Sequence, residues 1–464
     1  MNARSFSLFL LAAAAAACST TVTTENPTLA NASAPEWTDR PSGDVPADEG
    51  RAVTLPVTVR AHDATKVTAT ARGEGVDAEL IADEAQPGDG MWHGKLRVVV
   101  RYGSAKSATL AVDLDDGEGR TSSVDVKLAS RSLVWKKRVT WDKANGPQTR
   151  EHGIFVVDES AKQVFLFQGS GYDPQWKPIE DSWKLDLASG TWTSWVPTGD
   201  VPAARDAHRV SEVPGTPTAF VYGGYTGFGG TEKSEGDLYR LDVSNAGKNF
   251  TKLTSVGAAG PRQLHTIAYD AKGERLIVFG GFTDLPRQDA LDDTWTVKVN
   301  GDTATWTKIE GNAPAARYGF FSAFDAESRR LFVWSGGQIP ESDADPVNAA
   351  QDAWVLDASI DPPKWSKLAP AGEAPKGRRN GCAMHDPIGR RLFVYGGTSN
   401  GKTTEPGLYA LDLDKGHETW RKVDLGGAPP IRSSGFGFAT PEGDVVCAFG
   451  NGASVYADVN FLGY

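Results

Sequence analysis

Short runs of alternating apolar and polar residues occupy the chain from about residue 50 onward, and glycine- and aspartate-rich breaks separate them. Residues 53–59, 96–100 and 124–128 are such runs, and breaks stand at 88–90 and 115–117. A hydrophobic period of two residues predicts strands with one buried face. Closely spaced strands of this kind before residue 130 predict a small β-sandwich.

A longer pattern begins near residue 133 and recurs six times at intervals of about 55 residues. Each copy contains an arginine, an aliphatic and aromatic run that closes on paired glycines, an acidic-x-aromatic step and a tryptophan. The arginines are Arg150, Arg205, Arg262, Arg317, Arg378 and Arg432. In the third copy, residues 265–270, 275–281, 293–299 and 305–309 are four candidate strands joined by tight turns. Four antiparallel strands per repeat are typical of a β-propeller blade.

The repeat resembles the kelch repeat over about 330 residues. The resemblance rests on the paired glycines, the downstream tryptophan and the step Asp-x-Trp/Tyr-x-x-Asp at 181–186, 237–242 and 352–357. Two copies depart from the pattern, with Gln168 and Asn451 in place of glycines. The stretch 111–120 also resembles a turn of bacterial immunoglobulin-like modules. We therefore expect an all-β chain with an immunoglobulin-like sandwich followed by a six-bladed kelch-type propeller.

The propeller should be closed by an N-terminal strand. Fourth-strand aromatic residues follow the first five copies, at Trp192, Phe250, Trp306, Trp365 and Trp420, but none follows the sixth. A spare candidate strand lies at 135–141, and we expect it to complete the last blade and leave no exposed edge. The expected boundaries are a signal peptide at 1–17, a tether at 18–48, the sandwich at 49–130 and the propeller at 131–464.

The N-terminus is typical of an exported protein. Its apolar run, residues 6–17, is too short to cross a bilayer as a helix. The run ends Ala15-Ala16-Ala17-Cys18, which resembles the lipobox of bacterial lipoproteins. The resemblance implies acylation of Cys18, membrane anchoring and, because Ser19 follows, the outer membrane of a bacterial cell envelope. Ordinary cleavage beside an incidental cysteine is the alternative.

Charge and cysteine content narrow the function further. The formal net charge of -11 disfavours nucleic acid as a partner, because a polyanion would be repelled. Without Cys18, the chain has only Cys382 and Cys447, too few for a disulfide framework. We expect both to be buried thiols, with a disulfide between them as the alternative.

Two sets of side chains could bind a ligand on one face of the propeller. The meander places the repeat arginines on the same face as the varied loops 170–180, 225–236, 282–292, 338–351 and 398–407. The arginines could bind carboxylate or phosphate groups, but hydrogen bonding to neighbouring blades explains better why every repeat has one. Loop aromatics outside the repeat register could stack on sugar or peptide, and these are Tyr172, Trp176, Tyr225, Phe228 and Phe282.

His208 and His265 stand three residues after their arginines in adjacent repeats. They could join a ligand site, but no third ligand of matching phase accompanies them, so we expect hydrogen-bonding histidines rather than a metal site. Acidic loop residues such as Asp284 lack the spacing of a calcium loop. We expect no cofactor.

The best-supported function is a membrane-tethered protein that binds a protein, peptide or glycan through its propeller loops. The alternative is a carbohydrate-modifying enzyme, because kelch propellers include sialic-acid mutarotases as well as galactose-oxidase-like copper enzymes. The copper chemistry needs a tyrosine and histidine set that we do not find, whereas a mutarotase needs an arginine and a carboxylate in the channel.

Overall fold

The computed structural model describes residues 33–61, 67–84, 91–104, 106–139, 144–172, 175–244, 247–284, 289–338 and 349–464. These residues form strands, turns and loops, so the predicted all-β class is confirmed. None of them forms a helix long and apolar enough to cross a bilayer.

Eight strands between Glu36 and Ala129 form a sandwich of two four-stranded sheets. One sheet has the order β1 (Glu36–Trp37), β3 (Ala52–Arg60), β6 (Met91–Val100), β5 (Val76–Ala82). The other has the order β2 (Val45–Pro46), β8 (Thr121–Ala129), β7 (Ser107–Asp115), β4 (Thr68–Arg72). Val57, Val98 and Leu110 are at most 1% exposed and belong to the core between the sheets. Because β1 and β2 pair into these sheets, the strands begin before residue 49, inside the segment expected to be a tether.

The rest of the chain forms successive antiparallel sheets. The first contains β10 (Ile154–Asp158), β11 (Gln163–Phe167), β14 (Ser182–Asp186) and β15 (Thr191–Ser194). The second contains β17 (Arg209–Glu212), β18 (Thr218–Tyr222), β21 (Leu238–Asp242) and β22 (Phe250–Lys252). The third contains β24 (Thr266–Asp270), β25 (Arg275–Thr283), β26 (Asp289–Asn300) and β27 (Thr303–Ile309), and β23 (Thr254–Val256) pairs in parallel with β27.

The fourth sheet contains β28 (Phe321–Asp325), β29 (Arg330–Trp334), β30 (Ala353–Asp357) and β31 (Lys364–Leu368). The fifth contains β33 (Cys382–Asp386), β34 (Arg391–Tyr395), β35 (Leu408–Asp412) and β36 (Thr419–Val423), and β32 (Ala371–Gly372) pairs in parallel with β36. The sixth contains β37 (Val445–Ala448), β38 (Val459–Gly463) and β9 (Val134–Lys136).

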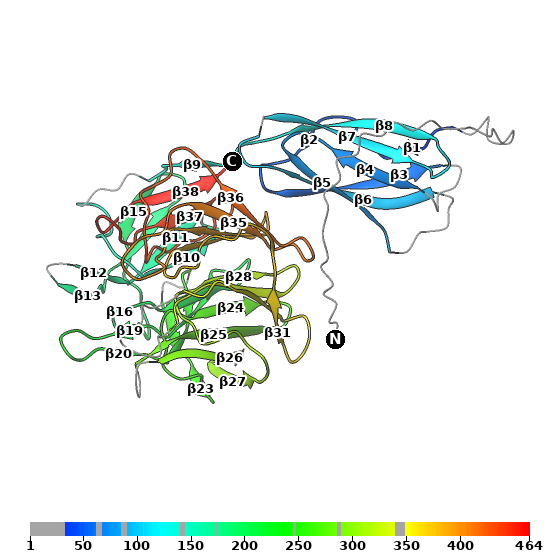
Figure 1. The fold of residues 1–464 in the computed structure, drawn as a ribbon. Helices are drawn as coiled ribbons and strands as arrows, with labels where there is room; N and C mark the ends of the chain where they lie inside the picture. Colours follow the sequence, from blue (N-terminus) through cyan, green and yellow to red (C-terminus); the bar gives the residue numbers. More distant parts are fainter. Residues whose placement is uncertain are drawn as a thin grey trace, which may run out of the picture.

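The sheets are arranged in a ring, shown below the sandwich in Figure 1. Six hydrophobic clusters of the ring each join two neighbouring sheets, and one of them joins the sixth sheet to the first through Phe438, Phe461 and Phe155. The fourth-strand aromatics Trp192 and Trp306 are 6% exposed and lie in these clusters. Packing between sheets, rather than within one, is therefore what stabilises each repeat.

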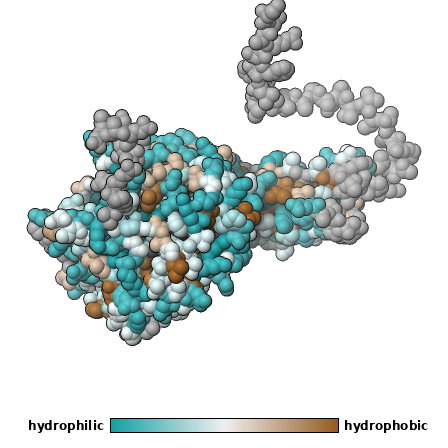
Figure 2. All heavy atoms as spheres, turned by 90° about the horizontal axis from the view of Figure 1, so that it is seen from below, coloured by the Kyte–Doolittle hydropathy of each residue, from teal (hydrophilic) through white to brown (hydrophobic). Residues whose placement is uncertain are grey.

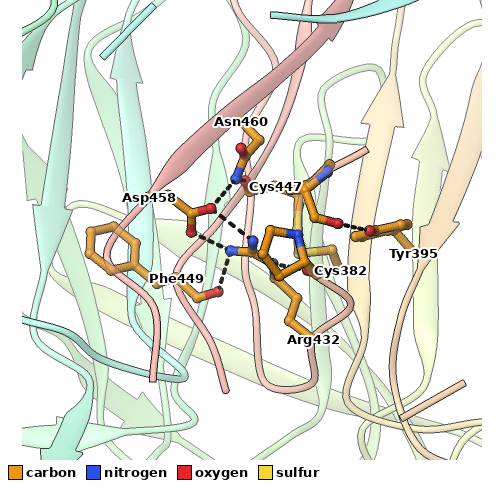
Figure 3. Close-up of a disulfide and its surroundings, with 9 residues drawn as sticks. Cys382, Tyr395, Arg432, Cys447, Phe449, Asp458 and Asn460 are labelled. Carbon is orange, nitrogen blue, oxygen red and sulfur yellow. Dashed lines mark hydrogen bonds and ion pairs between the residues drawn. A yellow bond between two sulfur atoms is a disulfide. The ribbon is translucent and has the colours of Figure 1, made fainter. Parts of the chain in front are cut away.

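The N-terminal strand β9 pairs with β38 in the sixth sheet, with Trp135 opposite Leu462. Trp141, at the end of the expected strand, lies outside the described residues. Cys382 and Cys447 form a disulfide between the fifth and sixth sheets, with 5.8 Å between their Cα atoms (Figure 3). The expectation of two free thiols was wrong, because the ring brings two strands that are 65 residues apart into contact.

A backbone ring surrounds the propeller axis. Its six members, each two residues after a repeat arginine, are His152, Ala207, Leu264, Gly319, Asn380 and Ser434. Each amide donates to the carbonyl of the preceding member, and His152 donates to Ser434, at distances of 2.5–3.2 Å. All six residues have φ between 53° and 59°, a conformation that is uncommon outside glycine. The same strained geometry in every sheet indicates a role in holding the ring together.

The propeller has two different faces. The loop face carries the segments between the second and third strands of each sheet, including the β12 (Ser170–Tyr172) and β13 (Trp176–Pro178) hairpin. It also carries the small sheet of β16 (Arg205–Asp206), β19 (Tyr225–Thr226) and β20 (Lys233–Ser234). The opposite side, the turn face, carries the tight turns between the first and second strands, such as 159–162 and 387–390.

The sandwich docks on the turn face at the fifth and sixth sheets. Arg391 donates hydrogen bonds to the carbonyl of Glu49 at 3.1 Å and to the Tyr102 hydroxyl at 2.9 Å, and Arg97 pairs with Asp414 at 3.0 Å. In Figure 1, β12, β13, β19 and β20 extend from the side of the propeller away from the sandwich. The sandwich therefore leaves the loop face free. Hydrophilic residues dominate the surface visible in Figure 2, and apolar groups there are small and separate.

Candidate functional site

The six repeat arginines form a buried belt, not a ligand-binding ring. Each is at most 2% exposed. In every repeat Nη1 donates to a carbonyl 17 or 18 residues later in the chain, at 2.9–3.2 Å. The belt consists of Arg150, Arg205, Arg262, Arg317, Arg378 and Arg432. Guanidinium groups bonded in this way are not available to a ligand, so the binding assignment is corrected. The carbonyl partners lie within the same repeat and not, as expected, in neighbouring blades.

Aspartates complete the belt in several repeats. Arg262 forms a two-pronged ion pair with Asp293, at 2.8 and 2.9 Å, and Arg432 pairs with Asp458 in the same way (Figure 3). Burial acts to raise the pKa of Asp293, but the hydrogen bonds and charge of Arg262 outweigh it and hold the pKa below its usual value. The pairs therefore remain ionised within the fold.

The histidines depart from expectation. His208 is fully buried and His265 is 3% exposed, yet neither ring has a hydrogen-bond partner at Nδ1 or Nε2 among the described residues. Burial, followed by the charges of nearby arginines, holds both pKa values well below the usual range, so the rings are neutral. The prediction of a hydrogen-bonding histidine is therefore wrong for His265. Among the residues that the structure describes, no cluster of three metal-ligating side chains occurs.

Four of the five loop aromatics gather on the loop face. Tyr172 and Trp176 lie opposite each other across the β12–β13 hairpin, and the Trp176 ring is 6.2 Å from that of Tyr225. Phe228 lies just beyond β19, and it and Tyr172 are 46% and 60% exposed. We call these four residues the aromatic patch. Phe282 packs instead against Tyr318, with ring centroids 5.4 Å apart.

Acidic groups lie near Tyr225 of the aromatic patch. Burial raises the pKa of Tyr225, and the charges of Asp284, Glu232 and Asp206 raise it further. Asp284 also accepts a hydrogen bond from the amide of Ser234 in β20, at 2.7 Å. Large exposed rings beside carboxylates suit a ligand with cationic side chains, because both groups attract positive charge.

An axial cavity, which the sequence did not reveal, extends from the backbone ring to the turn face. Its volume is about 490 Å³. The position seven residues after each belt arginine lines it in all repeats, as Val157, Glu212, Tyr269, Phe324, His385 and Ala439. Arg209 and His265 line it nearer the backbone ring. The Glu212 side chain is exposed within the cavity, yet protein atoms surround it, and this desolvation raises the pKa of Glu212 to about 7.

Comparison with known proteins identifies the repeat. Residues 115–308 and 271–462 match the KLHDC2/KLHL20/DRC7 kelch-repeats domain. The chain belongs to this kelch-repeat family. The match confirms the predicted kelch β-propeller.

The similar curated proteins include plant and yeast proteins. Adagio-like protein 3 of Oryza sativa subsp. japonica is 26% identical over 329 residues, which are 67% of this chain and 50% of that protein. Adagio protein 3 of Arabidopsis thaliana is 25% identical over 310 residues, 65% of this chain and 48% of that protein. The chain thus spans about half the length of these relatives. The solved structure of YjhT covers 68% of this chain and 95% of its own, with a TM-score of 0.49 and 14% identity.

Proposed function

We propose that this kelch protein is a membrane-tethered binding protein of the cell envelope that engages a protein partner through the aromatic patch. The observation that carries the proposal is the position of Tyr172, Trp176, Tyr225 and Phe228 on the loop face, which the sandwich does not cover. Aromatic side chains often dominate binding energy at interfaces, and exposed ones cost little to rearrange. Kelch propellers generally bind proteins, which supports a protein over a glycan.

The partner segment should carry lysine or arginine side chains. The patch offers aromatic faces for cation–π contacts, and Glu232, Asp284 and Asp206 lie close enough to influence Tyr225. The chain as a whole is also acidic, with a formal net charge of -11. Such complementarity speeds association and weakens as salt is added.

A pull-down from envelope extract, followed by titration of the captured partner, tests the proposal. We expect the double variant Tyr172→Ala/Phe228→Ala to weaken binding by roughly 30-fold or more, as removal of hot-spot aromatics does. The matched control is Ile360→Ala, because Ile360 is 47% exposed in the segment between β30 and β31 on the turn face. Equal binding by wild type and double variant would refute the role of the aromatic patch. Binding to a glycan on a glycan array, with no protein captured from the extract, would refute a protein partner.

The tether belongs to the same proposal. Cys18 lies outside the described residues, so the lipobox resemblance is its main support. The disulfide Cys382–Cys447 adds support, because disulfides persist in oxidising compartments such as the bacterial periplasm. Membrane fractionation of wild type and Cys18→Ala tests it: the variant should move to the soluble fraction. An unchanged membrane fraction would contradict lipidation.

We further infer that the ring has six blades and that the sandwich is immunoglobulin-like. The pairing of β9 with β38 and the six-membered backbone ring support the blade count. Two packed four-stranded sheets support an immunoglobulin-like sandwich.

A carbohydrate-modifying enzyme is the second candidate. One observation favours it: an arginine and a carboxylate, Arg209 and Glu212, both line the axial cavity. Exchange between sugar anomers, followed by NMR with and without the protein, tests this function. Exchange no faster than in buffer would remove it.

A further inference from the structure

The axial cavity is separate from the aromatic patch and opens on the other side of the propeller. Its inner end is lined by His152, Gly319 and Asn380 of the backbone ring, and its outer end by turn residues such as Pro214 and Pro387. No residue of the loop segments between second and third strands lines it among those described. A volume of about 490 Å³ lies within the range of small-molecule sites.

Polar atoms without partners cluster at the inner end. His265 is 3% exposed and has no partner at either ring nitrogen, and Oδ1 of Asn380 has none either. His385, farther along the wall, lacks a partner at Nε2. Buried polar groups are nearly always hydrogen-bonded, so a concentration of exceptions around one cavity indicates that its contents complete them.

The cavity wall also carries a positive charge that no carboxylate neutralises. Arg209 donates from Nη1 to the carbonyl of His208 at 3.1 Å, and no carboxylate of the described residues is within ion-pair distance of it. The nearest acidic influence is Asp206, whose Oδ2 accepts a hydrogen bond from Ser170. Burial lowers the pKa of Arg209 to about 10, which leaves it charged at neutral pH.

Aromatic side chains form much of the remaining wall. They are Phe155, Phe320, Phe324, Phe436 and Phe438. A ligand that fits must therefore offer an anionic group to Arg209, hydrogen-bonding atoms to His265 and Asn380, and an apolar or ring-shaped body to the phenylalanines.

We propose that the axial cavity is a binding site for a small organic anion, a carboxylate or phosphate monoester with a ring-shaped body, held by Arg209 and His265. The site is independent of the aromatic patch and needs no catalysis. A single anionic group is expected, because the Glu212 side chain faces the outer part of the same cavity and disfavours a second negative charge.

Benzoate and phenyl phosphate are suitable probes, with benzyl alcohol as the uncharged control. Saturation-transfer NMR and titration against the full-length protein should show saturable binding of at least one anion, at least tenfold tighter than the alcohol's. We expect Arg209→Gln to weaken anion binding by about tenfold or more, and Arg209→Lys to restore part of it. The matched control is Arg240→Gln, since Arg240 pairs with Asp302 on the outer part of the second sheet.

Either of two results would overturn the proposed anion site. No saturable binding of either anion up to about 10 mM, or equal anion binding by Arg209→Gln and wild type, would overturn the proposal. Thermal unfolding checks that each variant folds. If Arg209→Gln does not fold, His265→Phe tests the same site, and we expect it to weaken anion binding several-fold. The patch variant Tyr172→Ala/Phe228→Ala should bind the anion as wild type does, so failure of one site is distinguishable from failure of the other.

Discussion

The arginine belt and the wall of the axial cavity come from positions only seven residues apart in each repeat, yet they are opposite in character. The belt position is arginine in all six sheets, and each guanidinium bonds to backbone within its own repeat. The wall position differs in every sheet and includes Glu212, Tyr269 and His385. A residue that is identical in all repeats has a structural role within each blade. Variation across repeats permits one asymmetric site.

The two regions also differ in how their polar atoms are satisfied. In the belt, Arg262 has both a carbonyl and a carboxylate as partners. At the cavity, His265 has none among the described residues, and Arg209 has only a carbonyl. The belt therefore contributes to stability, whereas the cavity wall gives up some stability and keeps groups ready for a ligand.

The largest expected effect is at the disulfide, which reinforces the framework beside Arg432. Replacing both Cys382 and Cys447 by alanine removes a cross-link between residues 65 apart and should lower the free energy of unfolding by about 4 kcal/mol. Urea unfolding at neutral pH measures this. Anion binding by the folded fraction should stay unchanged. A loss under about 1 kcal/mol would show that the ring closes as firmly without the cross-link.

The next largest loss of stability is expected in the arginine belt. Arg262→Ala leaves Asp293 without its partner and should cost about 3 kcal/mol, at the low end for a broken buried pair because Asp293 keeps 20% of its side chain exposed. Arg205→Ala should cost less, about 2 kcal/mol, since Arg205 bonds only to carbonyls among the described residues. Urea unfolding of the two variants gives the difference. The reverse order would mean that the carboxylates do not strengthen the belt.

The framework could be predicted from the sequence because it repeats. Six copies expose the strand pattern, the fourth-strand aromatics and the missing strand that β9 supplies. The sequence offered the disulfide only as an alternative to free thiols, because Cys382 and Cys447 meet only through the curvature of the ring. Their positions within two different repeats do not indicate that they are in contact.

The candidate site was partly visible in the sequence. Tyr172, Trp176 and Phe228 stand out because they break the repeat register. The cavity was missed because β17, Arg209–Glu212, has the composition of an exposed strand. The sequence reveals the cavity only when the six repeats are aligned on their belt arginines and the residues seven positions later are compared. Whether His265 finds partners depends on neighbouring sheets, which one sequence does not give.

A smaller effect, of opposite sign, is expected at His265. His265→Phe removes two buried nitrogens without partners and places there the residue that Phe320 supplies at the same phase of the next repeat. We expect stability to rise by about 1 kcal/mol while anion binding falls. The reciprocal variant Phe320→His should lose stability. A destabilised His265→Phe would mean that the ring nitrogens have partners in solution, and the contrast with the belt would weaken.

The last prediction concerns the pH dependence of stability at Glu212. Its folded pKa of about 7 exceeds the value of 4.5 for an unperturbed side chain, so between these values the folded protein keeps a proton that the unfolded chain has lost. Stability should therefore fall as pH rises from about 4.5 to 7 and level off above. Glu212→Gln should remove this slope, measured as the difference between urea midpoints of variant and wild type at each pH. Glu159→Gln is the matched control, because Glu159 lines the same cavity at the neighbouring turn. A difference that does not change with pH would place the Glu212 carboxylate in bulk-like water, and the cavity would then be open rather than enclosed at this depth.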